Sequence, residues 1–170
     1  MKKKYTINEV IEKIDGLKSL KDCDRFESNM LSLGYIEDEL ISCLKRKRIH
    51  LRKSELEEKL LLEKSEEVSE KLINDFLIAL GAYEEFLSTK NSKKTIAQRL
   101  RQNIKKIGLR DALINATSKK TLTDGYKYLI NEGLEEYTLE KVILNNKELF
   151  DEDLVVFIKD KINKIGRAHV

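Results

Sequence analysis

Apolar residues recur along the chain at intervals of three and four positions, the spacing of one face of an α-helix. The first helix is predicted to begin after Thr6, which forms with Glu9 the Thr-x-x-Glu pattern of a capping box, and to end at Gly16. Its apolar face consists of Ile7, Val10, Ile11 and Ile14. A second capping pattern at residues 19–22 opens another apolar stripe, which closes at Gly34.

The same periodicity predicts seven further helices and no strand. The first of them covers residues 36–51, and the same apolar spacing continues to residue 61. The next three cover residues 65–87, 93–107 and 109–116, and the last three begin after Thr123, Thr138 and Asp151. Residues 155–158 are β-prone by composition, but the cap at Asp151 and the polar residues that follow favour a helix. Gly81, inside the predicted fourth helix, indicates either close packing or a bend.

The predicted fold is therefore all-α, with two parts that meet at the polar segment 88–92. Residues 1–87 are expected to form long antiparallel helices, packed with or linked to a compact basic cluster of short helices in residues 88–164. Proline is absent from the 170 residues, which favours long helices and short connections because proline breaks helices. This length suits one domain, or one domain with a helical arm.

The sequence gives no indication of secretion or membrane insertion. The basic N-terminus is not followed by an apolar run of signal-peptide length. No segment approaches the roughly 20 apolar residues of a membrane helix. We therefore expect a cytoplasmic protein without a membrane partner, in which Cys23 and Cys43 are free thiols on apolar stripes.

Positive charge is concentrated in one segment, although the formal net charge is only +3. Residues 90–110 contain eight basic residues and no acidic one. Leu100, Ile104 and Ile107 are predicted to face the core, so a ridge formed by Lys94, Gln98, Arg101 and Lys105 should face away from it. Such a ridge can follow a phosphate backbone, and neutral amides beside it can contact phosphates or base edges.

The leading hypothesis is thus a non-catalytic helical module that binds nucleic acid through this helix. Its predicted contact residues are Lys94, Gln98, Arg99, Arg101, Gln102, Lys105, Lys106 and Arg110. The alternative for the same residues is pairing within the fold, because acidic blocks lie at residues 55–70 and 132–153. A second basic run, residues 45–53, would support binding if the fold brought it beside residues 90–110.

Two other functional classes remain open. One is a protein-interaction module or homodimer, in which Leu56, Leu60, Leu61 and Leu62 form an exposed apolar patch. The other is a targeting arm of a larger DNA-processing protein whose remainder follows Lys164. The last six residues, 165–170, match the translation of a common sequencing adapter, so we expect them to be a non-native tail.

No combination of residues predicts catalysis or metal binding. His50 lies alone in a basic helix, and with two cysteines it cannot complete a tetrahedral zinc set. Residues 57–59 match the Glu-x-Lys fragment of many nucleases, but there the fragment lies on a strand and here it lies in a predicted helix. No glycine-rich phosphate loop is present. We therefore expect no enzyme activity, no cofactor and no small-molecule substrate.

Residues 82–162 carry a set of motifs with a recognisable order. They are Ala82-Tyr83-Glu84-Glu85-Phe86-Leu87, Lys90-Asn91, Arg99, Arg101, Ile104, Gly108 and Ala112, then Thr123-Asp124-Gly125-Tyr126, Leu129, Gly133-Leu134, residues 140–144 and Leu149-Phe150. This set resembles the C-terminal part of an uncharacterised family of bacterial helical proteins with no assigned activity. Members tend to carry His-Pro before the position of Leu149, where this chain has Asn146-Lys147-Glu148. The resemblance implies a bacterial or phage origin and a helical fold, and supplies no catalytic residues.

Overall fold

The computed structural model describes residues 5–60, 62–63 and 65–166. Over these ranges the fold is all-α, as predicted, and no strand is present. The α-helices are α1 Ile7–Asp15, α2 Leu20–Ser32, α3 Asp38–Leu60, α4 Glu70–Asn91, α5 Gln98–Ile107, α6 Leu109–Thr117, α7 Asp124–Asn131, α8 Leu139–Asn145 and α9 Glu152–Gly166. Two 3-10 turns, η1 Glu135–Tyr137 and η2 Lys147–Leu149, flank α8.

Local capping signals place several helix starts as the sequence predicts. Thr6 and Glu9 form both halves of the capping box of α1. The hydroxyls of Ser19, Thr123 and Thr138 accept hydrogen bonds from the third backbone amides of their helices. The β-prone residues 155–158 lie inside α9, which confirms the helical assignment.

Two predicted starts were too early. Helix α4 begins at Glu70 rather than near residue 65, because the Ser69 hydroxyl caps it and residues 65–68 form a tight turn with paired backbone groups. Helix α5 begins at Gln98 rather than at residue 93. Before it, Ser92 adopts a left-handed conformation (φ 52°) that ends α4 and starts a loop through residue 97.

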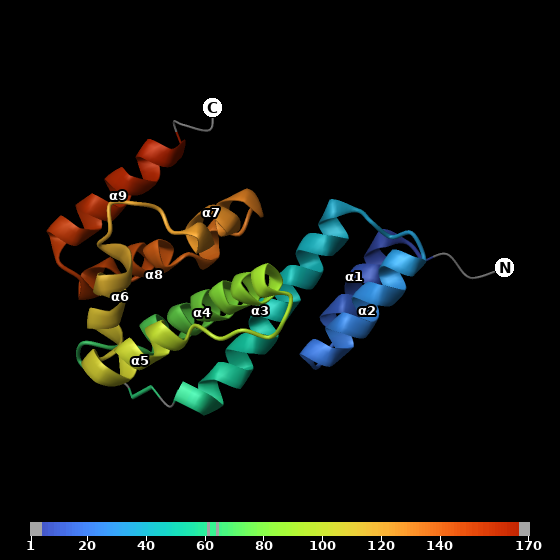
Figure 1. Cartoon of the computed structure of the whole chain (residues 1–170), viewed down its shortest axis with the longest axis horizontal. Coiled ribbons are helices and arrows are strands. Elements are labelled where there is room, and N and C mark those ends of the chain that lie inside the picture. Colours follow the sequence, from blue (N-terminus) through green and yellow to red (C-terminus); the bar gives the residue numbers. More distant parts are fainter. Residues whose placement is uncertain (1–4, 61, 64, 167–170) are drawn as a thin grey trace.

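The helices form two lobes that share α3 (Figure 1). Helices α1 and α2 pack on the first half of α3, around a core that includes Val10, Cys23 and Leu40. The larger lobe contains α4–α9 and the end of α3, with a core that runs from Leu56 to Ile158. Helix α4 thus belongs with the later helices, so the apolar cores do not divide at the predicted segment 88–92.

Gly81 brings α3 and α4 into close contact. A Cβ atom at this position would lie 3.0 Å from the backbone oxygen of Ile49 and 3.4 Å from Cβ of Arg52. Of the two roles that the sequence suggested for Gly81, the structure therefore shows close packing. Ile49 itself is buried with Ala82, Leu129 and Leu134 in a small cluster between α3, α4 and α7. Within the described residues, no helix has both the length and the apolar character needed to cross a membrane.

Gly125→Ala tests the other tight glycine contact. A Cβ atom at Gly125 would lie 2.5 and 2.7 Å from Cε2 and Cδ2 of Tyr83. We expect the substitution to lower the free energy of unfolding by about 1–3 kcal/mol, because the ring or α7 must move. Urea titration followed by circular dichroism measures this change. In a Tyr83→Ala background the same substitution should be neutral or stabilising, since alanine favours helix over glycine. An equal loss in both backgrounds would rule out the clash.

Candidate nucleic-acid interface

Helix α5 is anchored by a buried carboxylate on α4. Glu84 is 2% exposed and accepts hydrogen bonds from the backbone N–H of Ala97 (2.9 Å) and from Nε and Nη2 of Arg101 (2.7 Å each). Ala97 is the N-cap residue of α5 and has no side chain that could cap it. Glu84 therefore caps α5 from a neighbouring helix, and its negative charge is favourable at a helix N-terminus.

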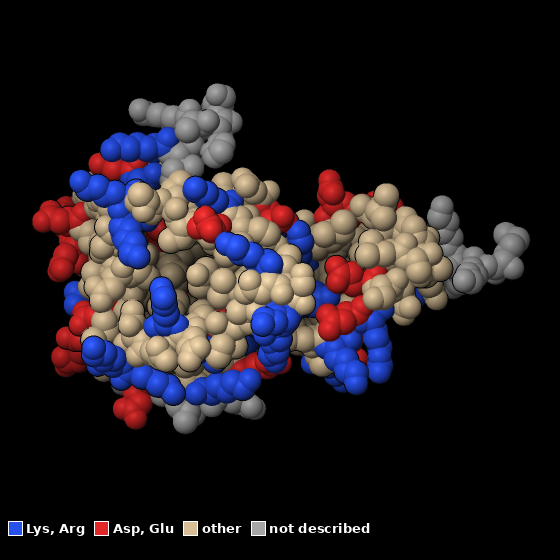
Figure 2. Space-filling view, viewed as in Figure 1, with Lys and Arg blue, Asp and Glu red and all other residues tan. Residues whose placement is uncertain are grey.

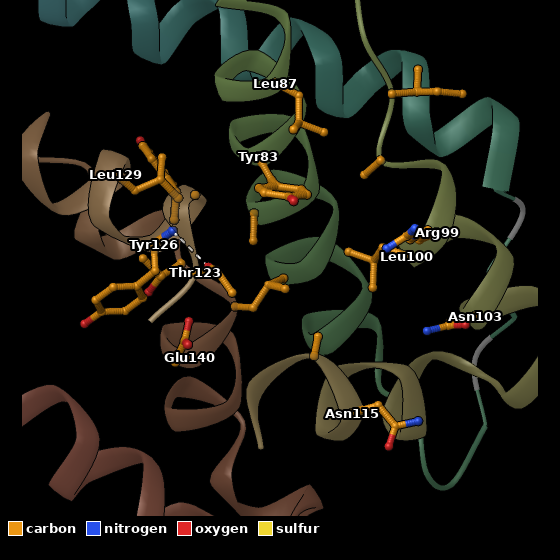
Figure 3. A pocket seen from close by; sticks show the side chains of 18 of the residues that line it. Tyr83, Leu87, Arg99, Leu100, Asn103, Asn115, Thr123, Tyr126, Leu129 and Glu140 are labelled. Carbon is orange, nitrogen blue, oxygen red and sulfur yellow. Dashed lines mark hydrogen bonds between the residues drawn. The ribbon is translucent and has the colours of Figure 1, made fainter. Parts of the chain in front are cut away.

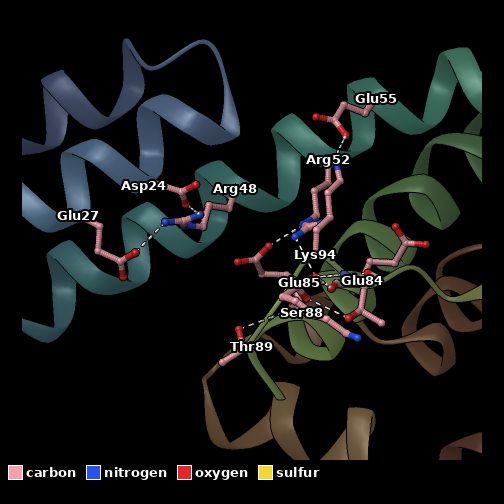
Figure 4. A network of polar contacts seen from close by, with 12 residues as sticks. Asp24, Glu27, Arg48, Arg52, Glu55, Glu84, Glu85, Ser88, Thr89 and Lys94 are labelled. Atoms are coloured by element: carbon pink, nitrogen blue, oxygen red, sulfur yellow. Dashed lines mark hydrogen bonds and ion pairs between the residues drawn. The ribbon is translucent and has the colours of Figure 1, made fainter. Parts of the chain in front are cut away.

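The loop before α5 is held by Ser88 of α4. Its Oγ accepts a hydrogen bond from the backbone N–H of Thr95 (2.9 Å) and donates to the backbone oxygen of Glu84 (2.7 Å). Arg52 of α3 donates to the same Oγ (3.1 Å) and forms an ion pair with Glu85 at 2.6 Å (Figure 4). The start of α5 is thus fixed by groups from both α3 and α4.

The prediction that Arg101 faces away from the core is wrong. Its guanidinium turns inward and makes a two-bonded ion pair with the buried Glu84, a partner that helical periodicity alone does not reveal. Lys94 lies in the loop rather than on the helix, and it pairs with Glu55 (3.2 Å). Arg110 donates to the backbone oxygen of Leu149 (2.8 Å). The side-chain positions of Lys94, Arg101 and Arg110 are therefore explained by partners within the fold.

The other predicted contact residues lie on the free surface of α5. Within the part of the chain that the structure describes, these exposed side chains have no hydrogen-bond or ion-pair partner: Gln98, Arg99, Gln102, Lys105 and Lys106. Lys119 and Lys120, which follow α6, are also exposed and without such a partner. We call Arg99, Lys105, Lys106, Lys119 and Lys120 the free basic face. Figure 2 shows Lys and Arg side chains around a hollow on this lobe.

The second basic run does not extend this face. On α3 it makes ion pairs that join neighbouring elements: Arg48 with Asp24 and Glu27, Lys45 with Glu132, and Arg46 with Glu136. Lys53 pairs with Glu57 within α3. Figure 4 shows Arg48 pointing from α3 toward the two acids of α2. Its cations are therefore used to hold the lobes together.

A cavity of about 680 Å³ lies between α4, α5, α6, α7 and α8 (Figure 3). Its apolar wall includes Tyr83, Leu87, Leu100 and Leu129, and its polar lining includes Arg99, Asn103, Asn115, Lys119, Thr123 and Glu140. Cavities of this volume suit drug-sized ligands. Arg99 and Lys119 belong both to the cavity lining and to the free basic face, so the two features adjoin.

A buried ion pair lies behind this cavity. Glu140 of α8 (5% exposed) accepts from Nζ of Lys161 of α9 (8% exposed) at 2.8 Å, and Lys161 also donates to the backbone oxygen of Thr117. Burial, together with nearby Glu140 and Glu135, raises the pKa of Tyr126 to about 12. Tyr126 therefore stays protonated at neutral pH.

The remaining candidate residues have structural surroundings. Cys23 is buried, Cys43 is half-buried, and both are free thiols, as expected. Desolvation of the His50 ring and the charges of neighbouring Lys53 and Lys47 lower the pKa of His50. Among the described residues, no cluster of three His, Cys, Asp or Glu side chains could hold a metal ion.

The predicted apolar patch is not exposed where the structure describes it. Leu56 is 2% exposed and belongs to the main core, against which Leu60 and Leu62 are packed and partly buried. Leu61 lies outside the described residues, as do residues 167–170 of the suspected tail. The three described leucines therefore pack on the core rather than forming a fully exposed patch.

Arg52 lies in the basic run of α3 and is also buried. Sequence reasoning missed the burial of three further charges, Glu84, Glu140 and Lys161. Each lies on the apolar stripe of its own helix: Glu84 follows Leu77 and Leu80 at spacings of seven and four, and Lys161 follows Ile158 by three. A charged residue on an apolar stripe needs a buried partner, and that signal could have identified all three.

No protein-family model matches the sequence, and no curated protein or solved structure shows significant similarity to it. The resemblance of residues 82–162 to an uncharacterised bacterial family therefore stays a prediction.

Arg101→Leu tests the anchor of α5. Removing the guanidinium leaves the buried carboxyl of Glu84 without its main partner, so we expect the free energy of unfolding to fall by about 3–5 kcal/mol. Arg99→Leu is the matched control on the same helix, and as an exposed site it should change stability by less than about 0.5 kcal/mol. Chemical denaturation measures both variants. Equal effects would contradict the structural role of Arg101.

Proposed function

We propose that this chain is a non-catalytic nucleic-acid-binding module that contacts phosphates through the free basic face. Gln98 and Gln102, exposed on the same helix, would donate further hydrogen bonds to the backbone or to base edges. Unlike the eight residues predicted from the sequence, this set leaves out Lys94, Arg101 and Arg110, whose charged groups are paired within the fold.

The observation that carries the proposal is the position of Arg99. Lys105 and Lys106 lie in the last turn of α5, where the helix dipole favours cations, so local stability accounts for them. Arg99 lies in the first turn, where the dipole disfavours a cation, and it is exposed without a partner in the described structure. An external anion would relieve this unfavourable arrangement.

The arrangement of the face also suits a polyanion. Helix α5 has ten residues and is therefore about 15 Å long. Cations lie at both of its ends, and Lys119 and Lys120 follow the adjacent α6. Neutralising several phosphates with such a group releases condensed counterions, which is the main driving force for binding nucleic acid.

Charge reversal tests the proposal. The triple variant Arg99→Glu, Lys105→Glu, Lys106→Glu should bind an oligonucleotide of about 16 nucleotides at least tenfold more weakly than the wild type does. The slope of log affinity against log salt should fall by about 2–3, since each lost phosphate contact removes about 0.7–0.9. Fluorescence anisotropy with labelled single-stranded RNA, single-stranded DNA and duplex DNA measures both quantities.

The matched control reverses three exposed lysines on other elements, Lys18→Glu, Lys21→Glu and Lys159→Glu. It changes the net charge by the same amount, so it should keep most of the affinity if binding is confined to the free basic face. Equal loss in both triple variants would show only a general charge effect. No binding by the wild type at low salt would refute the proposal and favour a protein partner.

A further inference from the structure

The cavity next to α5 has two kinds of wall. One part is apolar and carries the ring of Tyr83 with Leu87, Leu100 and Leu129. The other part carries the amides of Asn103 and Asn115, which are exposed and have no hydrogen-bond partner in the described structure. Figure 3 shows Leu100 and Asn103 on the same side of this space, Leu129 on the other side, and Tyr83 between them.

The Tyr83 ring is held in position from behind. Gly125 lies directly against it, and the absence of a Cβ atom there allows α7 to approach. Phe86 packs on Tyr83 with ring centroids 6.0 Å apart, and Tyr128 packs on Phe86 at 4.9 Å. The cavity wall is therefore a braced aromatic surface rather than a single mobile side chain.

Two cations also line this cavity. Arg99 and Lys119 line the cavity from the segments that carry the free basic face. The carboxylate of Glu140, which also lines it, is already neutralised by Lys161. A ligand with an anionic end at Arg99 and Lys119 and an uncharged planar end in the cavity would match this distribution.

We propose that the cavity accepts one unstacked nucleotide of a single strand that lies along α5. The base would lie against Tyr83 and the leucines, with its edge toward Asn103 and Asn115 and its phosphate toward Arg99 and Lys119. Unpaired bases stack on aromatic side chains and use their edges for hydrogen bonds in this way. The volume of about 680 Å³ lies within the range for ligands of this size. This inference rests on the proposed function and adds a preference for single strands.

The test fills the cavity without changing any charge. Ala116 of α6 lines it and is half-buried, so Ala116→Phe should occupy part of the space. Ser118→Phe, two positions later and exposed, does not line the cavity and serves as the matched control. Circular dichroism and thermal melting establish that each variant is folded.

The first measurement uses oligonucleotides. The wild type should bind a single strand at least about tenfold more tightly than the duplex of the same sequence. Ala116→Phe should remove this difference and leave duplex binding unchanged, whereas Ser118→Phe should keep it. If Ala116→Phe does not fold, Asn103→Ala with Asn115→Ala takes its place, because both side chains are exposed and their loss should reduce the single-strand preference.

The second measurement uses free adenosine 5′-monophosphate, with ribose 5-phosphate as the probe that lacks a base, followed by NMR. Nucleotide binding that Ala116→Phe abolishes, with weaker binding of ribose 5-phosphate, would support the cavity even if no oligonucleotide binds and the proposed function fails. Oligonucleotide binding that is indifferent to Ala116→Phe, without nucleotide binding, would overturn the cavity proposal and leave the proposed function standing. Absence of binding in both measurements would overturn both.

Discussion

The placement of α5, and with it the free basic face, depends on one buried carboxylate. Glu84 is buried in the larger lobe and needs hydrogen-bond donors around it, because an unpaired buried carboxylate is strongly unfavourable. The backbone of Ala97 and the guanidinium of Arg101 supply these donors. Their positions fix the rotation of α5 about its axis. Arg99, two residues and thus about 200° from Arg101, must then point away.

The basic side chains of this molecule fall into two main groups: those paired with acids of other elements and those exposed without a partner in the described structure. The cations of α3 mostly join that helix to α2, α4 and α7, and Arg48 alone contacts two acids of α2. Two arginines in these pairs are largely buried, with 12% of the Arg48 side chain and 8% of the Arg52 side chain exposed. Together the pairs define how the elements are oriented. The free basic face is what remains after these internal pairs are made. The net charge of +3 does not reveal this division, because it sums the paired and the unpaired charges alike.

The elements could be predicted because their signals are local. Thr6, Ser19, Thr123 and Thr138 cap helices within three or four residues of themselves, and the apolar spacing extends through each helix. The inward turn of Arg101 could not be predicted from periodicity, since its partner lies 17 residues earlier on another helix. The cavity was beyond sequence reasoning for the same reason, because five helices supply its walls. The basic segment itself was found, and the structure narrows which of its residues are free.

Helix α3 has 23 residues and is therefore about 34 Å long, and it runs without a break from one core to the other. Leu40 and Leu44 belong to the first core and Leu56 to the second. A displacement of α1 or α2 would therefore be passed to the larger lobe through one continuous helix, since no loop interrupts α3 between the two cores. Gly81 of α4 holds α3 at Ile49. The smaller lobe can therefore rotate relative to the larger one only if α3 bends near Ile49 or separates from α4.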